Sequence, residues 1–237
     1  MIAPLFIVGA GGFGREVFSI IEALRSTNSM PQIAGFIDDH PSAADLKNLA
    51  SLGSRLVGSI DDLVRRAEPF SAVVAVGSAV DRETIADLLA PSPVTFPVLV
   101  HPDTTIGCDV YLAEGVVVAA GSRLSTNIHV GRHVQIDQNA AIGHDCSLGE
   151  FARLNPQACV SGTVTIGRRA LIGANAIVLQ GIKVGEDATV GPALWYTAHF
   201  RQLQPLWGSP RDDSTTWTHA PPQQSCSSGD LDHPEDD

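Results

Sequence analysis

A six-residue repeat of aliphatic side chains runs through the second half of the chain. A period of six fits neither an amphipathic helix nor an alternating strand. It is typical of a hexapeptide β-helix, in which three short strands form one triangular coil and each coil buries its aliphatic side chains against the next. Isoleucine, leucine or valine occupies sixteen consecutive positions spaced by six residues: Val100, Ile106, Leu112, Val118, Leu124, Val130, Ile136, Ile142, Leu148, Leu154, Val160, Ile166, Ile172, Val178, Val184 and Val190.

The positions between these residues support the same fold. The fourth residue after each repeat position is small or aliphatic, as at Ala140, Ala152 and Ala158, which suits a corner inside a narrow prism. No insertion interrupts the repeat, so no loop is expected to leave the prism. We predict a left-handed parallel β-helix over residues 98–191, with about five coils of eighteen residues each.

Residues 1–97 show a different pattern, in which strand-like and helix-like segments alternate. Strands are predicted at 5–8, 33–37 and 72–76, and helices from residue 14 onward, at 60–66 and at 82–89. Such alternation is typical of a parallel sheet with helices on its faces. The fold class is therefore α/β plus β-solenoid, with a small Rossmann-like domain before the β-helix.

Residues 192–237 keep neither period. They hold all three tryptophans and a Ser/Gln/Pro-rich run, and they end in a cluster of acidic residues. Such a composition favours an irregular segment, disordered at least in its second half. We predict a third, irregular region over 192–237.

Composition narrows the functional classes. The net charge of −11 argues against nucleic acid or an anionic membrane as a partner. No apolar run reaches the length of a membrane span, and the apolar start leads directly into a glycine motif, which predicts a strand rather than a signal peptide. The four cysteines show neither metal-binding spacing nor a disulfide framework, which favours a cytoplasmic location.

A glycine motif follows the first predicted strand. The run Gly9-Ala10-Gly11-Gly12-Phe13-Gly14 matches G-x-G-x-x-G and precedes a helix. Glycines let the backbone turn tightly beside a phosphate, and the helix N-terminus offers free N–H groups. Asp38 and Asp39 end the second strand, where a carboxylate would contact a ribose or a base. The domain is too small for both halves of a dinucleotide fold, so a mononucleotide ligand fits better. A glycine turn that only packs the sheet is the alternative.

His144 is the candidate catalytic residue. It lies two positions after Ile142, so its side chain is expected to leave the core at the prism surface. Imidazole side chains ordinarily titrate near neutral pH and suit removal of a proton from an attacking amine or hydroxyl. Asp145 beside it could orient the ring. The alternative is a solvated surface histidine; His129 and His133 are equally exposed by the repeat but have no acidic neighbour.

Taken together, these motifs resemble the sugar acetyltransferase family that includes bacterial nucleotide-amino-sugar N-acetyltransferases and sialic acid O-acetyltransferases. The resemblance rests on the glycine motif, on Asp38-Asp39, on Gly77 with Arg82, on His101-Pro102 and on the run from Ile142 to Pro156, I-G-H-D-C-S-L-G-E-F-A-R-L-N-P. It covers about residues 4–191.

The resemblance implies a homotrimer with active sites between adjacent subunits, a nucleotide sugar on the N-terminal domain and acetyl-CoA along the β-helix, with no metal. His144 would be the general base and Asp145 its acidic partner. The substrate-binding residues implied are Gly12, Phe13, Gly14, Asp38, Asp39, Gly77 and Arg82. The cofactor-binding residues implied are Arg153, Gly162, Gly173 and Ala174.

Two departures from the family bear on these assignments. Arg153 stands where relatives usually have a histidine that contacts acetyl-CoA, which puts cofactor affinity in question. The family's final coil and V-G-x-P-A-[KR] ending are also missing. Reading the codons of residues 192–212 one nucleotide upstream permits a string that restores both, so we interpret the tail as an out-of-frame product. Arg168, Arg169 and Lys183 are candidate contacts for the CoA phosphates or solvated charges on the prism.

Three functions remain open at this point. The first is an acetyl-CoA-dependent transferase acting on a nucleotide-linked amino sugar, or on a hydroxyl as in sialic-acid-type O-acetyltransferases. In it, His144 removes the acceptor's proton during direct attack on the thioester, and Cys146 is buried and not a nucleophile. The second is a metalloenzyme on the same prism, for which His129, His133 and His144 lack a suitable spacing. The third is an inactive nucleotide-sugar-binding scaffold.

Overall fold

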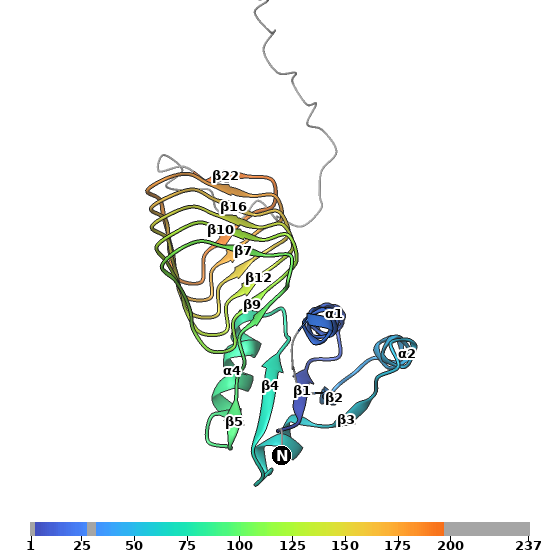
Figure 1. Ribbon diagram of the computed structural model, residues 1–237. Helices are drawn as coiled ribbons and strands as arrows, with labels where there is room; N and C mark the ends of the chain where they lie inside the picture. The colour runs from blue at the N-terminus through green and yellow to red at the C-terminus, as the bar shows by residue number, and fades with distance from the viewer. Residues whose placement is uncertain (1–2, 28–31, 197–237) are drawn as a thin grey trace, which may run out of the picture. The chain divides into compact units, whose positions relative to one another are not determined.

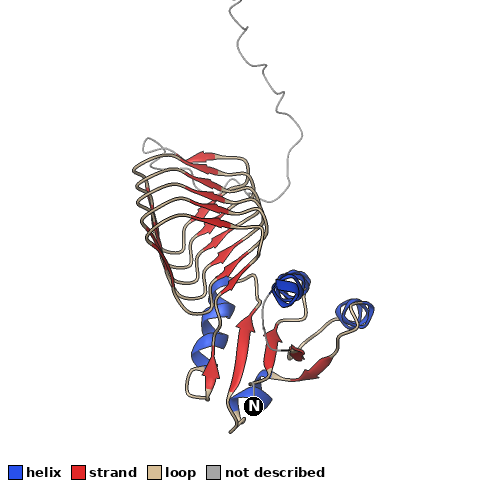
Figure 2. Ribbon diagram, in the orientation of Figure 1, coloured by secondary structure: helices blue, strands red, loops and turns tan. Residues whose placement is uncertain are grey.

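A computed structural model describes residues 3–27 and 32–196 of the 237-residue chain (Figure 1). Within this part, a parallel sheet with four helices is followed by three sheets of very short parallel strands, which form the sides of one β-helix (Figure 2). No helix of the described ranges is long and apolar enough to cross a bilayer. Most of the irregular region predicted over 192–237, residues 197–237, lies outside the described residues. Most of the segment that we interpret as an out-of-frame product lies there as well.

The first sheet has the order β3-β2-β1-β4-β5, with all neighbouring strands parallel. Its centre is formed by β1, where all four side chains are buried. The elements are β1 (Leu5–Val8), α1 (Gly12–Thr27), β2 (Ile33–Ile37), α2 (Ala43–Ser51), β3 (Leu56–Gly58), α3 (Ile60–Val64), β4 (Phe70–Val74), α4 (Ala79–Leu89) and β5 (Val94–Thr95).

The predicted strands and helices of this sheet are present with small shifts of their ends, but α2, β3 and β5 were not predicted. Serine caps explain where three helices begin. Ser42 and Ser59 each accept a hydrogen bond from the backbone N–H three residues on and donate their own backbone N–H to the aspartate side chain there, which completes a capping box, while Ser78 caps α4 in the same position. Such caps satisfy N–H groups that have no partner inside the helix.

The β-helix consists of three parallel sheets that share one core. The strands are β6 (Leu99–Val100), β7 (Thr105–Ile106), β8 (Val110–Leu112), β9 (Val117–Val118), β10 (Arg123–Leu124), β11 (Ile128–Val130), β12 (Gln135–Ile136), β13 (Ala141–Ile142), β14 (Ser147–Leu148), β15 (Arg153–Leu154), β16 (Cys159–Val160), β17 (Thr165–Ile166), β18 (Leu171–Ile172), β19 (Ile177–Val178), β20 (Lys183–Val184), β21 (Thr189–Val190) and β22 (Trp195–Tyr196). Each strand pairs with the strand one coil away, as Gln135 does with Arg153 eighteen residues later.

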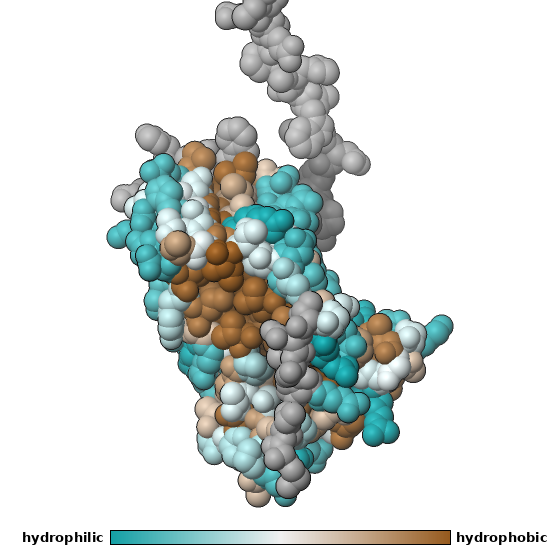
Figure 3. Space-filling view, in the orientation of Figure 1, coloured by the Kyte–Doolittle hydropathy of each residue, from teal (hydrophilic) through white to brown (hydrophobic). Residues whose placement is uncertain are grey.

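The repeat places its aliphatic residues inside, as predicted for this left-handed parallel β-helix. From Val118 to Val190 every repeat position is at most 3% exposed, and the small positions from Val116 to Ala176 are buried as well. Val100, Ile106 and Leu112 of the first coil are less deeply buried, with Ile106 40% exposed, because no further coil covers the edge strands β6, β7 and β8. Figure 3 shows apolar residues gathered over this part of the prism, around β7.

A left-handed backbone conformation closes every corner from residue 109 to residue 193. Twelve non-glycine residues spaced by six or its multiples have positive φ, among them Asn127, His133, Asp145, Phe151 and Arg169, and Gly115, Gly121 and Gly181 fill the remaining places. Only short polar residues and glycine adopt this conformation easily, so its regular use shows that coil stacking fixes the corners.

The sequence also led us to expect no regular structure from residue 192 onward. This expectation is wrong for Trp195–Tyr196, because β22 continues the stack by pairing in parallel with β19. The backbone of the prism therefore extends past residue 192, even though the side chain pattern of the repeat changes there.

We name the three corners of the prism by a residue on each. The His144 corner comprises the turns at 107–110, 125–128, 143–146, 161–164 and 179–182. The Arg168 corner comprises those at 113–116, 131–134, 149–152, 167–170 and 185–188. The Asp137 corner comprises those at 101–104, 119–122, 137–140, 155–158, 173–176 and 191–194.

Candidate functional site

The glycine motif, Asp38-Asp39 and Gly77 all follow strands of the first sheet at the same edge. They come directly after β1, β2 and β4, and β1 lies between β2 and β4 in the sheet. From β1 the chain passes to β2 on one side, and from β3 it crosses back to β4 on the other side of β1, which makes this edge a topological switch point. Ligands of open α/β sheets bind in the crevice at such a point.

The glycines of the motif serve two different purposes. A Cβ on Gly14 would lie 2.0 Å from the carbonyl oxygen of Gly9, and one on Gly9 would lie 2.6 Å from that of Ala75. These two glycines therefore let helix and strands pack closely. Gly11 has no atom within 4 Å of such a Cβ, and Gly12 has only the Arg15 guanidinium at 3.9 Å. The backbone there is open at the first turn of α1, whose N–H groups lack partners inside the helix.

The two predicted carboxylates are anchored to the neighbouring backbone. Asp38 accepts hydrogen bonds from the backbone N–H groups of Ala10 at 2.7 Å and His40 at 2.9 Å, so it braces the glycine loop. Asp39 accepts from the N–H of Ile60 at 2.9 Å and is exposed. Asp39 is thus the more accessible of the two for a ligand's hydroxyl or amide groups.

Arg153 lies at the same edge of the sheet. Its Nε and Nη2 donate to Asp137 Oδ2 at 3.0 and 2.9 Å, and its guanidinium sits 4.6 Å from the centre of the Phe13 ring. A Cβ on Gly77 would lie 2.8 Å from its Nη1, so the glycine leaves room for that edge of the guanidinium. The sequence suggested Arg153 as a cofactor contact, but in the chain itself it faces the predicted nucleotide-sugar loops.

Asp137 supports Arg153 from inside the protein, and sequence reasoning did not single it out. Its side chain is 2% exposed, and Oδ1 has no hydrogen-bond partner among the described residues. Burial raises the pKa of this carboxyl above its usual value, although the Arg153 guanidinium opposes the shift. Asp137 follows the repeat position Ile136, where nothing in the sequence distinguishes it from a solvated corner residue.

Arg82, which the resemblance implies as a substrate-binding residue, is buried inside the protein. The residue is 0% exposed. Its guanidinium donates to backbone carbonyl oxygens of Val76 at 2.8 Å, Gly77 at 3.2 Å and His133 at 3.0 Å, and also to that of Phe151. Burial lowers the pKa of Arg82 to about 9, which leaves it protonated at neutral pH. Its donors are occupied by the protein.

His144 and Asp145 occupy an exposed turn of their corner. His144 Nδ1 and Asp145 Oδ2 are 2.6 Å apart, and the two side chains are 51% and 48% exposed. Asn127, one coil away, donates from Nδ2 to Asp145 Oδ1 at 2.6 Å. Hydrogen bonds from Asn127 and then His144 hold the pKa of the Asp145 carboxyl below its usual value. Asn127 was not predicted, although its spacing of eighteen residues from Asp145 is the period of one coil.

Gly162 also belongs to this corner. A Cβ on Gly162 would lie 2.5 Å from His144 Nε2, so the coil above the imidazole must carry a glycine at this place. Cys146 follows in the same turn but is buried, and burial raises the pKa of its thiol. Its Sγ donates to the backbone carbonyl oxygen of Ser161 at 3.1 Å. These features do not suit a nucleophilic thiol.

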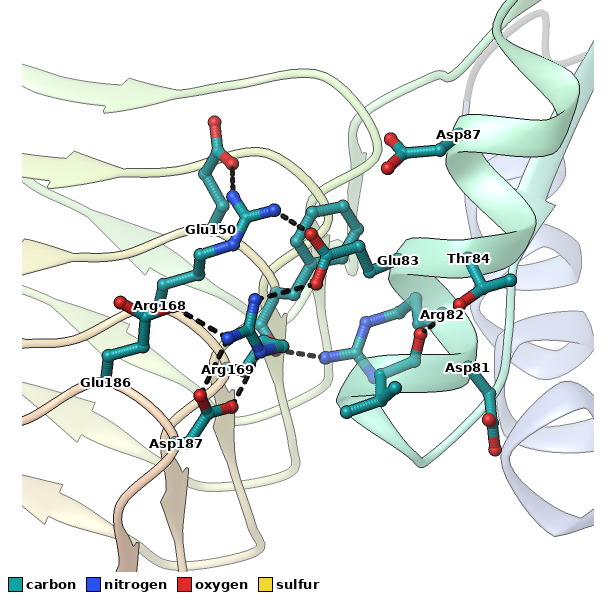
Figure 4. Close-up of polar contacts among 12 residues, drawn as sticks. Asp81, Arg82, Glu83, Thr84, Asp87, Glu150, Arg168, Arg169, Glu186 and Asp187 are labelled. Atoms are coloured by element: carbon teal, nitrogen blue, oxygen red, sulfur yellow. Dashed lines mark hydrogen bonds and ion pairs between the residues drawn. The ribbon is translucent and has the colours of Figure 1, made fainter.

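The other predicted cofactor contacts are separated from one another in a single chain. Gly162 lies on the His144 corner, and Gly173 and Ala174 lie on the Asp137 corner. Arg153 lies on the face between the Arg168 corner and the Asp137 corner. Arg168 and Arg169 lie on the Arg168 corner and are paired with carboxylates (Figure 4), Arg169 with Asp187 at 2.6 Å. Their guanidinium groups are therefore not free for phosphates of CoA.

The three histidines of the metalloenzyme alternative do not converge. His133 is 1% exposed and lies between the rings of Phe96 and Phe151, at 4.7 and 5.3 Å. His129 stacks on Tyr111 at the protein surface, with ring centres 4.9 Å apart. Among the described residues, no group of three or more His, Cys, Asp or Glu side chains could hold a metal ion.

Apart from Gly173 and Ala174, the predicted residues thus form two groups. One lies at the edge of the first sheet, and the other, His144 with Asp145, lies on a prism corner. Most prism residues that contact the N-terminal sheet or its helices belong to the Arg168 corner or to the face that follows it: Arg132, His133, Gln135, Phe151, Arg153, Arg168 and Arg169. Gln138 of the Asp137 corner also contacts Glu16 of α1. The His144 corner lies opposite that face of the triangular prism.

Two family models match the chain. The PglD N-terminal domain matches residues 4–89, and the hexapeptide repeat of succinyl-transferase matches residues 163–191. No curated protein sequence gives a significant match.

Solved structures extend the comparison over both domains. The acetyltransferase domain of PglB from Neisseria gonorrhoeae superimposes with a TM-score of 0.72 at 27% identity, over 83% of this chain and 92% of that one. A mutant of perosamine N-acetyltransferase from Caulobacter crescentus, in complex with CoA and GDP-perosamine, gives 0.72 and 27% over 83% and 90%. WeeI from Acinetobacter baumannii, at 24% identity and a TM-score of 0.56 over 81% and 98%, shares the fold.

Proposed function

We propose that this chain, an acyltransferase of the sugar acetyltransferase family, transfers the acetyl group of acetyl-CoA to an amine of a nucleotide-linked sugar. The observation that carries the proposal is the pairing of His144 with Asp145 and Asn127 on the prism, in a chain that also holds an open glycine loop at a sheet switch point. A relative of 27% identity that is a perosamine N-acetyltransferase supports an amine as acceptor.

His144 serves as the general base. Asp145 accepts a hydrogen bond from Nδ1, so the lone pair on Nε2 faces outward to meet a proton donor. The sugar amine attacks the thioester carbonyl carbon, its N–H proton passes to Nε2, and the carbon–sulfur bond breaks. His144 then passes the proton to the departing CoA thiolate. Because the amine attacks the thioester directly, no acyl-enzyme is formed. The buried Cys146 is consistent with direct attack.

The nucleotide sugar lies at the edge of the first sheet. The open N–H groups at Gly11 and Gly12 face one side of its diphosphate, and Arg153 Nη1, which has no partner among the described residues, faces the other. Asp137 neutralises the opposite edge of the same guanidinium and fixes its orientation. In this proposal Arg153 serves the nucleotide sugar rather than acetyl-CoA, unlike the histidine that relatives place there.

Acetyl transfer requires the two groups of residues to meet, and we propose that they meet between two copies of the chain. His144 projects from a corner that carries no contact with its own N-terminal sheet among the described residues. A neighbouring copy in a cyclic assembly, as the family resemblance implies, would bring its own switch-point crevice to this corner. Acetyl-CoA would then lie along the prism between the copies.

The release of CoA thiol tests the proposal. Acetyl-CoA would be offered with UDP-, GDP- and CMP-linked amino sugars and with the matching hydroxy sugars. We expect thiol release with at least one amino sugar that is at least tenfold faster than with its hydroxy analogue. Release with a hydroxy sugar alone would favour O-acetylation. No release with any of them, in a protein that still binds CoA, would contradict the proposal.

A further inference from the structure

Helix α4 joins the first sheet to the prism through a fully buried arginine. Figure 4 shows Arg82 and Glu83 projecting from α4 toward the turns that carry Glu150, Arg168 and Arg169. Arg82 donates hydrogen bonds to acceptors in the sheet domain and in the prism. Val76 and Gly77 belong to the turn after β4, and His133 and Phe151 belong to successive coils of the Arg168 corner.

The two prism carbonyls suit this arrangement because of the backbone at the corner. His133 and Phe151 both have positive φ, at 55° and 59°, and lie one coil apart. Their carbonyl oxygens accept from Nε and Nη2 of the same guanidinium, while Nη1 points to the sheet. A planar group with donors along two edges is needed to reach all four oxygens, and arginine provides it.

Gln135 completes the polar contact. Its Oε1 accepts from Arg82 Nη1 at 3.1 Å, and its Nε2 lies 3.4 Å from the carbonyl oxygen of Val74 and 3.3 Å from that of Val76. Gln135 is 1% exposed. The carboxyl end of β4 is therefore held by the prism through Arg82 and Gln135. Removal of the guanidinium would leave several buried carbonyl groups without a donor, which is costly.

Ion pairs surround this buried contact. Residues one coil apart along the Arg168 corner alternate in charge, as Arg132, Glu150, Arg168 and Glu186. From α4, Asp87 pairs with Arg132 at 3.2 Å and Glu83 pairs with Arg168 and Arg169. Partly exposed pairs contribute little energy individually, so their effect is mainly to select where α4 lies along the corner.

We propose that Arg82 is a positioning residue, which fixes the Gly77 turn, and with it the space beside Arg153, at a defined place on the prism. This inference rests on the proposed function, in which the Gly77 turn borders the nucleotide sugar. Arg82 acts through Gly77 and does not touch the substrate. Its loss therefore changes turnover through misplacement of the bound sugar, while the glycine loop and Asp39 continue to bind the nucleotide.

Amide hydrogen exchange tests this without a substrate. We expect Arg82→Met to raise the exchange rate of residues 74–79 at least tenfold and Arg82→Lys to raise it less, with residues 9–14 unchanged. Arg65→Met is the matched control, because Arg65 is 72% exposed and pairs only with Asp61 and Asp62 among the described residues. If Arg82→Met does not fold, Arg82→Lys carries the test. Unchanged exchange at 74–79 in a folded variant would overturn the proposal.

Ligand binding and turnover give the second readout, with the nucleotide sugar that supports thiol release. We expect Arg82→Lys to change the Kd of the nucleotide sugar by less than threefold and to lower kcat at least tenfold. A parallel loss of affinity and turnover would mean that Arg82 contacts the substrate, and would overturn the positioning role. If the unaltered protein releases no thiol, the proposed function fails, and hydrogen exchange alone decides whether Arg82 fixes the turn.

Discussion

The two halves of the candidate site differ in how they are supported. Around the switch point, Asp137 and Arg82 are almost completely buried and Arg153 is held by Asp137 and Phe13. On the His144 corner, the imidazole and its carboxylate are each about half exposed, and their support comes from one amide and one glycine. The first half is thus assembled within one chain, whereas the second presents its base outward to a ligand or to another copy.

The halves also use the backbone differently. At the sheet edge, glycine is required where strands and helix approach closely, as at Gly9 and Gly14. On the prism, stacking imposes a left-handed conformation at every corner, and Asn127 and Asp145 adopt it at φ values of 54° and 59°. Asparagine and aspartate tolerate this conformation better than other side chains. The corner conformation thereby favours an acidic or amide side chain directly after the histidine.

Replacement of the exposed base tests the sharpest claim of this comparison. His144→Ala should lower kcat by about 10²–10⁴, as loss of a general base does, and should leave stability within about 0.5 kcal/mol because the residue is half exposed. Steady-state kinetics and urea unfolding measure the two effects. A variant with undiminished turnover would exclude His144 as the base.

The burial of His133 predicts that the stability of the protein depends on pH. Burial first, and then the charges of Arg132 and Arg82, lower the pKa of His133 to about 4 from an ordinary value of 6.5. Between these values the unfolded chain binds a proton that the folded protein does not, so stability falls as the pH drops from about 6.5 to about 4. Over this whole pH interval, the loss of stability amounts to about 3 kcal/mol.

His133→Phe removes this group and keeps an aromatic ring between Phe96 and Phe151. Urea unfolding at pH 7 and pH 5 should show the unaltered protein losing about 2 kcal/mol more than the variant over this interval. Equal losses in the two proteins would mean that His133 is solvated in the folded state.

A smaller effect is expected from the glycine above the His144 ring. Gly162→Ala places a methyl group 2.5 Å from His144 Nε2, so the ring must turn away, and kcat should fall about tenfold. Gly185→Ala is the control, since a Cβ there meets nothing within 4 Å. Both variants should unfold at similar urea concentrations. Equal kcat values for the two would show that this position of the ring does not matter for turnover.

The sequence predicted the fold of the prism more accurately than the contacts between the prism and the N-terminal sheet. The six-residue period follows from burial in a repeated coil, so Val118 to Val190 could be placed from the chain alone. The same period places every corner on the surface, and it cannot tell which corner meets another domain. The family resemblance assigned Arg82 and Arg153 to ligands, whereas Arg82 bonds to protein carbonyls and Arg153 faces the sheet.

Other omissions had a signal in the sequence. Helix α2 was missed although Ser42 and Asp45 form the spacing of a capping box. Asn127 could have been found by comparing residues eighteen positions apart around Asp145. Asp137 and Gln135 had no such signal, because their importance depends on how the N-terminal sheet packs on the prism.

Mixing two inactive variants tests most directly whether the two halves meet between copies. Gly12→Asp puts a negative charge into the open glycine loop, where only Arg15 lies near, while His144→Ala removes the base. Each protein alone should release no CoA thiol above background. Co-expression in equal amounts should restore about a quarter of normal turnover, because half of the crevices are intact and half of these face an intact His144 in a cyclic assembly. Restoration would confirm a shared site, and assemblies containing both chains without recovered turnover would contradict it.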